Sequence, residues 1–245
     1  MHNPYDTLTL PIIGYLRSPL TQKFGTPRQP NLVAVEAVIE ITKPFADPNA
    51  FDGIEQFSHL WLIWQFHQNR VVGNAKDKFR PQVRPPRLGG NEKIGVFATR
   101  SMYRPANIGL SVVQFNRLEA DDKGVRLYVL GADMVDGTPI IDIKPYLAYS
   151  DSIANATSGF AQQQPTPKPV QLSEDAKQQL EQLIQTKQLT LADVEVITQL
   201  IAQDPRPAYR QQEVGQDFVM RYGQWDVGFM SNAEQQLVIK NLLAI

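Results

Sequence analysis

The sequence contains no cysteine, and this absence excludes several kinds of chemistry. Disulfide bonds, thiolate nucleophiles and zinc–thiolate sites all require cysteine. Histidine is scarce as well, because His2, His59 and His67 are the only three in 245 residues. No HExxH, DxDxDG or CxxC spacing is present. We therefore expect no bound metal.

Long hydrophobic runs are also missing. No run approaches the roughly 18 apolar residues of a membrane-spanning helix, and the first residues lack the basic and apolar regions of a secretory signal. Charged residues make up 20% and hydrophobic residues 42% of the chain, as in soluble globular proteins. These features together predict a cytoplasmic protein without a membrane partner.

The two commonest nucleotide-binding loops are absent too. Neither a GxGxxG segment after a strand nor a GxxxxGK[ST] segment occurs in the chain. A nucleotide-like cofactor would therefore need a different architecture from the Rossmann or P-loop folds.

Positive charge is concentrated in one part of this nearly neutral chain. From Arg70 to Arg104 there are nine Lys or Arg residues against Asp77 and Glu92, a surplus of seven in a chain of net charge −1. The stretch from Arg84 to Ser111 is also rich in Arg, Pro and Gly, and the last two residue types fix a non-repetitive backbone path. A rigid loop that presents guanidinium groups suits a polyanionic partner such as RNA.

Short runs of β-strand character follow one another from Leu8 to about Tyr149. In the clearest run, Val33 to Ile41, apolar residues alternate with Glu36 and Glu40. Seven such runs with turn signals between them favour a mainly β fold, a closed or nearly closed β-barrel, over a doubly wound sheet. The runs are residues 12–17, 32–41, 57–67, 94–99, 110–118, 125–130 and 139–143. For residues 54–66 and 110–118, periodicity leaves strand and short helix open.

The composition changes after the predicted barrel. Residues 161–170 are rich in Pro and Gln and indicate a linker or an extended strap. Ser173 then begins a predicted helix, and Thr190 with Asp193 resembles the capping box of a second one. Residues 218–229 and 237–243 could be strands or a short hairpin. We predict a β-barrel at residues 1–160 and a small α+β domain at residues 161–245.

Polar residues in the predicted loops each allow a structural and a functional interpretation. Asp133 and Asp136, at a turn, could cap backbone amides or hold the amino and hydroxyl groups of a small ligand. His67, after an aromatic run, could be a hydrogen-bonded rim residue or part of a wall for a purine. Arg28 could display a cation on a proline-braced loop or lie in an exposed turn. Asp142 could simply pair with a neighbouring lysine.

Six short motifs, in order along the chain, resemble the TsaA-like family and, within it, the bacterial tRNA methyltransferases. The resemblance implies a single-sheet β-barrel that binds S-adenosylmethionine without a Rossmann fold, usually as a homodimer. It also implies methylation of N6 of threonylcarbamoyladenosine beside the anticodon of a threonine tRNA. The motifs are PRQP at 27–30, SHLW at 58–61, RPPRLGG at 84–90, GVFATRS at 95–101, DGTPIIDIKPY at 136–146 and DPRPAY at 204–209.

The resemblance and the residue chemistry together predict three groups of site residues. The catalytic candidates, which could accept a proton from the methylated nitrogen, are Asp133, Asp136 and His67. The cofactor-binding candidates are Arg28, Gln29, Pro30, His67, Gln68, Arg100, Leu110, Asp133, Met134, Val135 and Asp136. The candidates for binding tRNA are Arg84, Arg87, Arg104, Asn107, Lys144, Tyr146 and Arg206.

Two of these tRNA candidates carry a qualification. The family commonly shows RPNPIG where this chain reads RPANIG at residues 104–109, so Asn107 would need a shifted loop to replace the family asparagine. The resemblance also implies that the barrel binds the cofactor and carries catalysis and that the second domain completes the tRNA-facing surface. Arg206 and Tyr209 could instead only anchor this domain to the barrel. Two other functions also remain open, namely a non-catalytic RNA- or nucleotide-binding module and a small-molecule methyltransferase.

Overall fold

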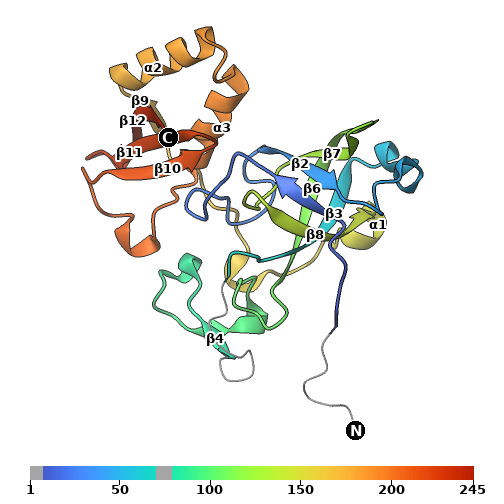
Figure 1. The fold of residues 1–245 in the computed structure, drawn as a ribbon. Helices are drawn as coiled ribbons and strands as arrows, with labels where there is room; N and C mark the ends of the chain where they lie inside the picture. The colour runs from blue at the N-terminus through green and yellow to red at the C-terminus, as the bar shows by residue number, and fades with distance from the viewer. Residues whose placement is uncertain (1–7, 70–78) are drawn as a thin grey trace.

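The computed structural model describes residues 8–69 and 79–245. Figure 1 shows a β-barrel, a second unit of helices over a sheet, and a small lobe around β4. Each neighbouring pair of barrel strands is antiparallel, and the order β1-β2-β7-β6-β3-β8 closes on itself. The predicted barrel is therefore confirmed. Its strands are β1 (Gly14–Arg17), β2 (Glu36–Ile41), β3 (His59–Gln65), β6 (Ile108–Asp121), β7 (Gly124–Leu130) and β8 (Thr138–Pro145).

Alternation along the strands fills the barrel. Successive side chains of a strand point to opposite faces, so the apolar residues of each strand fall on the inner face. Ile39 of β2, Leu62 of β3 and Leu127 of β7 are all completely buried in this core. The alternation that predicted the strand at residues 32–41 thus marks the inward face of β2, although its regular part begins only at Glu36.

The run at residues 94–99 was predicted as a strand of the barrel, and this prediction is wrong. Only β5 (Ile94–Gly95) is extended, and it pairs with β4 (Gln82–Val83) in a separate two-stranded sheet. Residues Val96–Ala98 form the 3-10 turn η5. The Thr99 amide and hydroxyl both donate to the Val96 carbonyl, at 3.2 and 2.8 Å, and close this turn.

Other short helices connect the strands. The open question about residues 54–66 is resolved as a 3-10 turn, η2 (Ile54–Gln56), followed by β3, and residues 110–118 lie within β6. The remaining short helices are η1 (Pro48–Phe51), η4 (Pro86–Leu88), α1 (Ala148–Asp151), η6 (Gly159–Ala161) and η7 (Ala208–Arg210). Within the described residues, no helix is long and apolar enough to cross a membrane.

Strand direction determines which loops meet. Because neighbours are antiparallel, the C-terminal ends of β1, β3 and β7 lie beside the N-terminal ends of β2, β6 and β8. The connections at residues 18–35, 66–107 and 131–137 therefore share one end of the barrel. We call this end the Asp136 rim.

The C-terminal unit is a sheet with two helices. Its strands run in the order β10-β11-β12-β9. Ser173 caps the first helix by accepting from the Ala176 amide, and Thr190 with Asp193 forms a full capping box on the second, so both predicted helix starts are confirmed. The elements are β9 (Val170–Leu172), α2 (Glu174–Gln185), α3 (Leu191–Ala202), β10 (Phe218–Tyr222), β11 (Trp225–Ser231) and β12 (Leu237–Ala244).

Part of the β1–β2 connection belongs to the core of the C-terminal unit. Leu20, Val33 and Val35 are buried in the same hydrophobic cluster as Met220. Gly25, at φ +92°, also packs there, and a Cβ on it would lie 2.3 Å from the Cγ atom of Met220. The hydrophobic cores of the chain therefore do not divide at residue 160.

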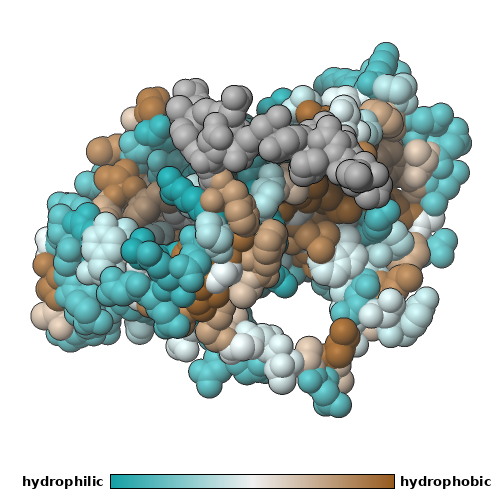
Figure 2. Space-filling model, turned by 90° about the horizontal axis from the view of Figure 1, so that it is seen from below, coloured by the Kyte–Doolittle hydropathy of each residue, from teal (hydrophilic) through white to brown (hydrophobic). Residues whose placement is uncertain are grey.

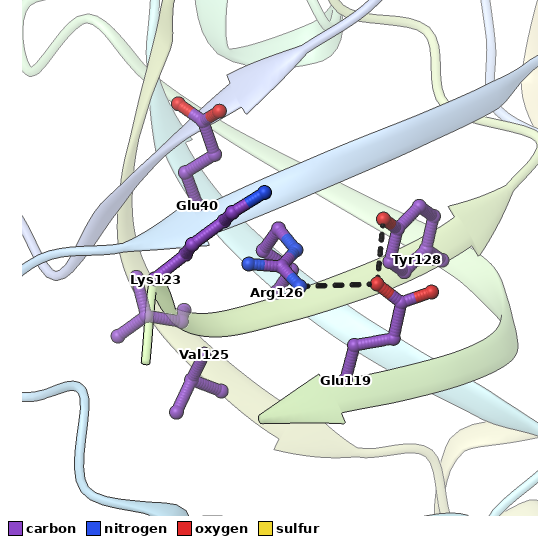
Figure 3. A pocket seen from close by; sticks show the side chains of 7 residues that line it. Glu40, Glu119, Lys123, Val125, Arg126 and Tyr128 are labelled. Carbon is purple, nitrogen blue, oxygen red and sulfur yellow. Dashed lines mark hydrogen bonds and ion pairs between the residues drawn. The ribbon is translucent and has the colours of Figure 1, made fainter. Parts of the chain in front are cut away.

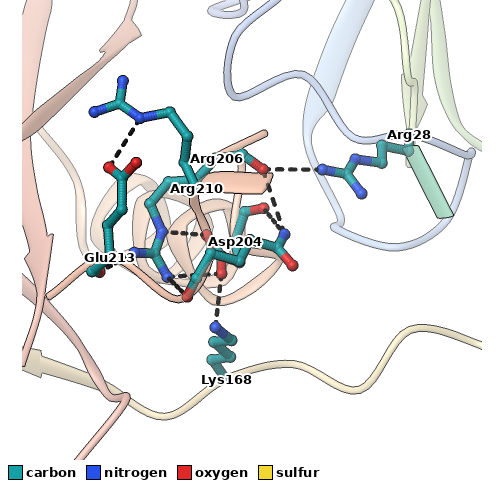
Figure 4. A network of polar contacts seen from close by, with 7 residues as sticks. Arg28, Lys168, Asp204, Arg206, Arg210 and Glu213 are labelled. Atoms are coloured by element: carbon teal, nitrogen blue, oxygen red, sulfur yellow. Dashed lines mark hydrogen bonds and ion pairs between the residues drawn. The ribbon is translucent and has the colours of Figure 1, made fainter. Parts of the chain in front are cut away.

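A buried ionic network adds a polar contact at this junction (Figure 4). Arg206, fully buried, donates from Nε and Nη2 to the two carboxylate oxygens of Asp204 at 2.7 and 2.9 Å. Burial alone would raise the pKa of Asp204, but hydrogen bonds from Arg206 and Lys168 outweigh it and hold that pKa below its usual value. Arg28 of the β1–β2 connection donates to the Arg206 carbonyl at 3.3 Å. Arg206, predicted to bind tRNA, is thus buried, and its carbonyl contacts the β1–β2 connection.

Candidate functional site

The turn between β7 and β8 is held to the β1–β2 connection through its backbone. The Asp136 amide donates to the Leu20 carbonyl at 2.7 Å, and the Gly137 amide donates to the Leu16 carbonyl at 2.8 Å. In return, Asp136 Oδ1 accepts from the Ser18 amide at 3.1 Å. One carboxylate oxygen of Asp136 therefore caps a backbone amide, as the structural interpretation of this turn predicted.

Asp133 lies in a different environment on the same turn. Its Oδ1 accepts from the Ser111 hydroxyl at 2.6 Å, and the Ser111 Oγ accepts from Trp64 Nε1 at 3.0 Å. Burial raises the pKa of Asp133 to about 6, while the hydrogen bond from Ser111 and the charge of Arg100 act in the opposite direction. Around neutral pH this carboxylate is ionised, yet it gains a proton far more readily than an exposed aspartate.

The Trp64–Ser111–Asp133 chain depends on strand register. Trp64 of β3 faces Gly109 of β6, and Leu62 faces Ser111. A Cβ on Gly109 would lie 2.3 Å from the Trp64 ring, so only glycine lets the indole lie against β6. The indole N–H then reaches Ser111, and the hydroxyl in turn reaches Asp133.

Arg100 connects two of the three loops at the Asp136 rim. Its Nη1 donates to the side-chain oxygen of Gln29 at 2.6 Å. Its charge also acts on Asp133, as described above. Gln29, Arg100 and Asp133, predicted as cofactor residues from three distant motifs, are therefore brought together.

His67 lies at the same rim, beside the turn at Gly137. A Cβ on Gly137 would lie 3.9 Å from His67 Nε2. Burial lowers the pKa of His67 and Lys23 acts in the same direction, while a hydrogen bond that the imidazole donates to the Gln65 backbone and the charge of Asp136 both oppose them. The lowered pKa favours the neutral imidazole, which can accept a proton. The adjoining Gln68 carbonyl accepts from Lys23 Nζ at 3.3 Å.

The remaining cofactor candidates contribute apolar surface or main chain. Leu110, 53% exposed, adjoins Ser111 on β6 and presents an apolar side chain at the rim. Met134 is buried in the barrel core, and the Val135 carbonyl accepts from the Thr138 hydroxyl at 2.6 Å. Pro30 is half-buried in the β1–β2 connection. Only Leu110 among these four has a freely accessible side chain.

Two predicted tRNA residues lie at the opposite end of the barrel. Lys144 pairs with Asp142 at 2.8 Å, and the Tyr146 ring lies 6.2 Å from the His59 ring and 6.0 Å from the Trp61 ring. Lys144 is the seventh residue of β8, which is eight residues long, and Tyr146 directly follows the strand; at about 3.3 Å per residue both are about 20 Å or more from the Asp136 rim. Neither is brought together with Asp133 or Asp136.

The other tRNA candidates lie on the connection between β3 and β6. Arg84 and Arg87 are exposed there, and Arg104 Nη1 donates to the Thr99 carbonyl at 2.9 Å. Arg70, Lys76 and Lys78, which add to the basic surplus of the sequence, lie outside the described residues.

Asn107 has a backbone role in this structure. Its φ is 48°, in the left-handed region that asparagine tolerates and proline cannot adopt. Its carbonyl accepts from the Phe66 amide at 2.8 Å, which joins the start of β6 to the end of β3. The turn at residues 104–109 must therefore differ from that of a sequence with proline at this position.

A hollow lies elsewhere on the barrel (Figure 3). Its volume is about 650 Å³, and its lining includes Glu40, Lys123 and Arg126. These residues come from the end of β2 and the β6–β7 hairpin, at the opposite end from the Asp136 rim. Arg126 is paired there with Asp121 at 2.7 Å and with Glu119 at 3.2 Å. None of the predicted site residues lines this hollow.

The sequence analysis missed Ser111, Trp64 and Lys23 as parts of the site. Ser111 could have been found from the sequence, because it is the one polar residue among the inward-facing positions at the start of β6. Trp64 was assigned only to an aromatic run, and its hydrogen bond to β6 depends on a register that a single sequence does not reveal.

Comparison with known proteins places the chain in a family. The family model described as the tRNA-methyltransferase O N-terminal domain matches residues 15–152, and the TrmO C-terminal domain model matches residues 165–244. The chain belongs to the TrmO family. The resemblance to bacterial tRNA methyltransferases that the motifs indicated is thereby confirmed.

Relatives in the TrmO family are similar over most of the chain. A tRNA (adenine(37)-N6)-methyltransferase of Escherichia coli is 42% identical over 228 residues, which are 89% of this chain and 93% of that protein. A relative from Pseudomonas aeruginosa, RcsF, is 46% identical over 88% of both chains and is described as a candidate S-adenosylmethionine-dependent methyltransferase. The crystal structure of TrmO from Pseudomonas aeruginosa matches with a TM-score of 0.77, 34% identity and coverage of 98% of this chain and 99% of that chain.

Proposed function

We propose that this chain is an S-adenosylmethionine-dependent methyltransferase that modifies N6 of adenosine 37 in tRNA, beside the anticodon. The observation that carries the proposal is the convergence of Gln29, Arg100 and Asp133 at the Asp136 rim. The names of the E. coli and P. aeruginosa relatives supply the reaction and the donor.

The residues at the rim fit the methyl donor in their chemistry. S-adenosylmethionine supplies an electrophilic methyl group on a sulfonium. Its amino acid and ribose need charged and polar partners, which Asp133, Asp136 and Arg100 can provide, and Leu110 offers an apolar contact for a purine. The Arg28 side chain is bonded to the Arg206 carbonyl, so we propose that Arg28 and Pro30 act mainly through their backbone.

We propose Asp133 as the residue that accepts the proton of the acceptor nitrogen. The lone pair of that nitrogen is delocalised into the purine, so a base at its N–H assists attack on the methyl group. The new N–C bond forms as the S–C bond breaks, and the proton passes to the carboxylate. With a pKa of about 6, Asp133 is ionised at pH 7 and basic enough to share this proton. Neutral His67 is the second candidate.

The finer features of the function are also proposals. We propose threonylcarbamoyladenosine as the acceptor, a threonine tRNA as the substrate, a homodimer as the assembly and the cytoplasm as the location. Arg84, Arg87 and Arg104 would bind phosphates or the threonyl carboxylate, because the guanidinium fork matches such oxyanions. Residues 1–160 would carry the chemistry, with residues 161–245 as the accessory domain.

The deciding experiment is transfer of labelled methyl from S-adenosylmethionine to bulk tRNA that lacks this methylation, followed by mass analysis of the nucleosides. Label in N6-methylated threonylcarbamoyladenosine would support donor, acceptor and reaction together. Asp133→Asn should bind tRNA normally and transfer methyl at least 100-fold more slowly. If wild-type protein binds the donor but labels no RNA, the proposal fails in favour of a small-molecule acceptor.

A further inference from the structure

Two large aromatic side chains are exposed side by side on the connection between β3 and β6. Phe97 is 71% exposed and Phe79 is 51% exposed. Their ring centroids are 6.1 Å apart with an angle of 31° between the ring planes. We call this pair the aromatic platform. Neither phenylalanine belongs to the predicted site, and a tight pair of exposed phenylalanines is costly in water unless something covers it.

Local structure holds the platform in place. The Val96 amide donates to the Pro81 carbonyl at 2.9 Å, next to the β4–β5 pair, and this bond brings the two phenylalanines together. Val96 itself is buried, and Thr99 closes the turn that contains Phe97. The platform is therefore a fixed feature of the fold.

The charge around the platform selects its partner. Residues 79–104, which we call the basic lobe, contain six Lys or Arg residues and one carboxylate, Glu92, for a local net charge of +5. Arg80 adjoins Phe79, and the ion pairs of the described residues involve none of the six cations. Figure 2, seen from the side of this lobe, shows apolar residues among hydrophilic ones on this face. Aromatic rings among cations that form no ion pair within the described residues match single-stranded nucleic acid, whose bases stack while its phosphates are neutralised.

The position of the lobe identifies which part of the RNA it would bind. Arg100 reaches the Asp136 rim, and Phe97 lies three residues before it. Because three residues span at most about 11 Å, the backbones of Phe97 and Arg100 are no farther apart than that. Stacked nucleotides rise about 3.4 Å each, so this reach corresponds to about three nucleotides. Bases in a duplex are already stacked, and an unpaired loop presents its bases freely.

We propose that Phe97 and Phe79 stack with an unpaired base of the anticodon loop, within a few nucleotides of the adenosine that is methylated. The proposal rests on the proposed function and adds a stacking contact to the phosphate contacts assigned to the arginines. Stacking orients the loop, whereas the surrounding cations supply affinity that does not depend on base identity.

The first test is a binding titration that requires no turnover. Phe97→Trp places an indole on the platform, and its fluorescence is titrated with a synthetic anticodon stem-loop RNA and with a fully paired duplex of equal length. We expect quenching by the stem-loop, beyond the signal of wild-type protein, and little change with the duplex. Equal responses to both RNAs, or no response, would overturn the proposal.

The second test separates stacking from charge. Phe97→Ala should weaken stem-loop affinity about 5- to 100-fold and leave the slope of log affinity against log salt unchanged. Arg84→Ala should instead reduce that slope by about 1. Tyr149→Ala is the matched control, since Tyr149 is 89% exposed on α1 beyond the far end of the barrel. An unchanged affinity in folded Phe97→Ala, or a change in oligomeric mass without loss of RNA binding, would refute the platform.

The outcomes distinguish this proposal from the proposed function. If wild-type protein methylates tRNA and Phe97→Ala does so with an unchanged KM for tRNA, the platform is wrong and the function stands. If no methyl is transferred but the Phe97→Trp fluorescence responds only to the stem-loop, the platform stands and the reaction is wrong. Phe97→Tyr, which retains a ring, should restore most of the affinity that Phe97→Ala loses.

Discussion

At the scale of single residues, the site depends on how one carboxylate is held. Asp133 and Asp136 are three residues apart on one turn, yet Asp133 accepts a hydrogen bond from the buried Ser111 hydroxyl and has a pKa that burial raises to about 6. Asp136 uses one oxygen to cap the Ser18 amide. The two aspartates therefore differ in their hydrogen-bond partners, which favours Asp133 as the proton acceptor and Asp136 as a support of the turn.

Replacing Ser111 by alanine should change the pH dependence of methyl transfer. The Ser111 hydroxyl donates to the ionised form of Asp133 and so lowers its pKa; without it, that pKa should rise above about 6. If ionised Asp133 is required, activity rises through this pKa, and the acid limb of the pH–rate profile should move to higher pH. Single-turnover rates from pH 5 to 9 would measure this shift.

A second buried serine provides the control for this prediction. Ser231, on β11 in the C-terminal unit, is buried, and its hydroxyl has no hydrogen-bond partner among the described residues. Ser231→Ala should leave the pH–rate profile where it is in the wild type. A Ser111→Ala profile that also keeps its acid limb in place would show that Asp133 does not limit the rate.

Arg104 should affect tRNA more than the methyl donor. Its Nη1 braces the turn through the Thr99 carbonyl, and its remaining donors can bind an oxyanion in a bidentate manner. Arg104→Ala should raise the KM for tRNA about 10-fold and change S-adenosylmethionine affinity less than 2-fold. Arg104→Lys keeps the charge but not the guanidinium fork, so it should raise the KM for tRNA by a smaller factor. Steady-state kinetics with tRNA and calorimetry with the donor would separate the two. Unchanged tRNA kinetics in Arg104→Ala would remove Arg104 from the interface.

At the scale of elements, apolar alternation and capping residues predicted most of the structure. Val33 to Ile41 shows its period of two because one face of β2 fills the barrel, and Ser173 and Thr190 begin helices because their side chains bind free amides. The run at residues 94–99 has the same apolar character, but hydrogen bonds within and beyond it make it a turn. The Trp64–Ser111 bond depends on pairing between β3 and β6, which local patterns do not encode.

The turn that carries both aspartates should tolerate no side chain at its first position. Gly131 has φ +83°, and a Cβ there would lie 2.3 Å from the Asn31 side-chain oxygen. Asn31 itself joins the turn to β6, because its amide donates to the Gly131 carbonyl and its side chain donates to the Val112 carbonyl, each at 2.9 Å. Gly131→Ala should cost about 1–3 kcal/mol of unfolding free energy and weaken S-adenosylmethionine binding, as measured by chemical denaturation and calorimetry.

The matched control for this glycine lies in the β6–β7 hairpin. Gly124 also has a positive φ, +115°, but an added Cβ would meet nothing within 4 Å. Gly124→Ala should lose stability through backbone strain alone and bind S-adenosylmethionine as the wild type does. Equal loss of cofactor binding in the two variants would mean that the Gly131 contact with Asn31 does not position the site.

At the scale of the whole molecule, charge and packing assign different roles to the two parts. Residues 161–245 contain 7 Lys or Arg and 10 Asp or Glu, a net charge of 7 − 10 = −3, whereas residues 1–160 contain 17 and 15, a net charge of +2. Electrostatic attraction to tRNA therefore favours the basic lobe over the C-terminal unit. Because that unit shares its core with Leu20, Val33 and Val35, we propose that it mainly supports the β1–β2 connection, which carries Gln29.

Substitution of Arg206 tests this supporting role in the full-length chain. Arg206→Met keeps much of the side-chain volume but leaves the carboxylate of Asp204 buried with Lys168 as its remaining cationic partner. Removing one partner of a buried ion pair typically costs about 3–5 kcal/mol, so the thermal unfolding midpoint should fall by several degrees. S-adenosylmethionine affinity should fall as well, because the β1–β2 connection loses a fixed Arg206 carbonyl for Arg28.

The double variant Asp204→Asn with Arg206→Met separates charge from position. It removes the uncompensated carboxylate, so it should recover part of the lost stability, while the contact between Arg28 and the Arg206 backbone stays weakened and cofactor affinity stays low. The supporting role predicts that tRNA affinity, measured with the donor saturating, is nearly normal in both variants. A large loss of tRNA binding with normal donor affinity would instead place Arg206 and its loop at the RNA interface, as the motif at residues 204–209 first suggested.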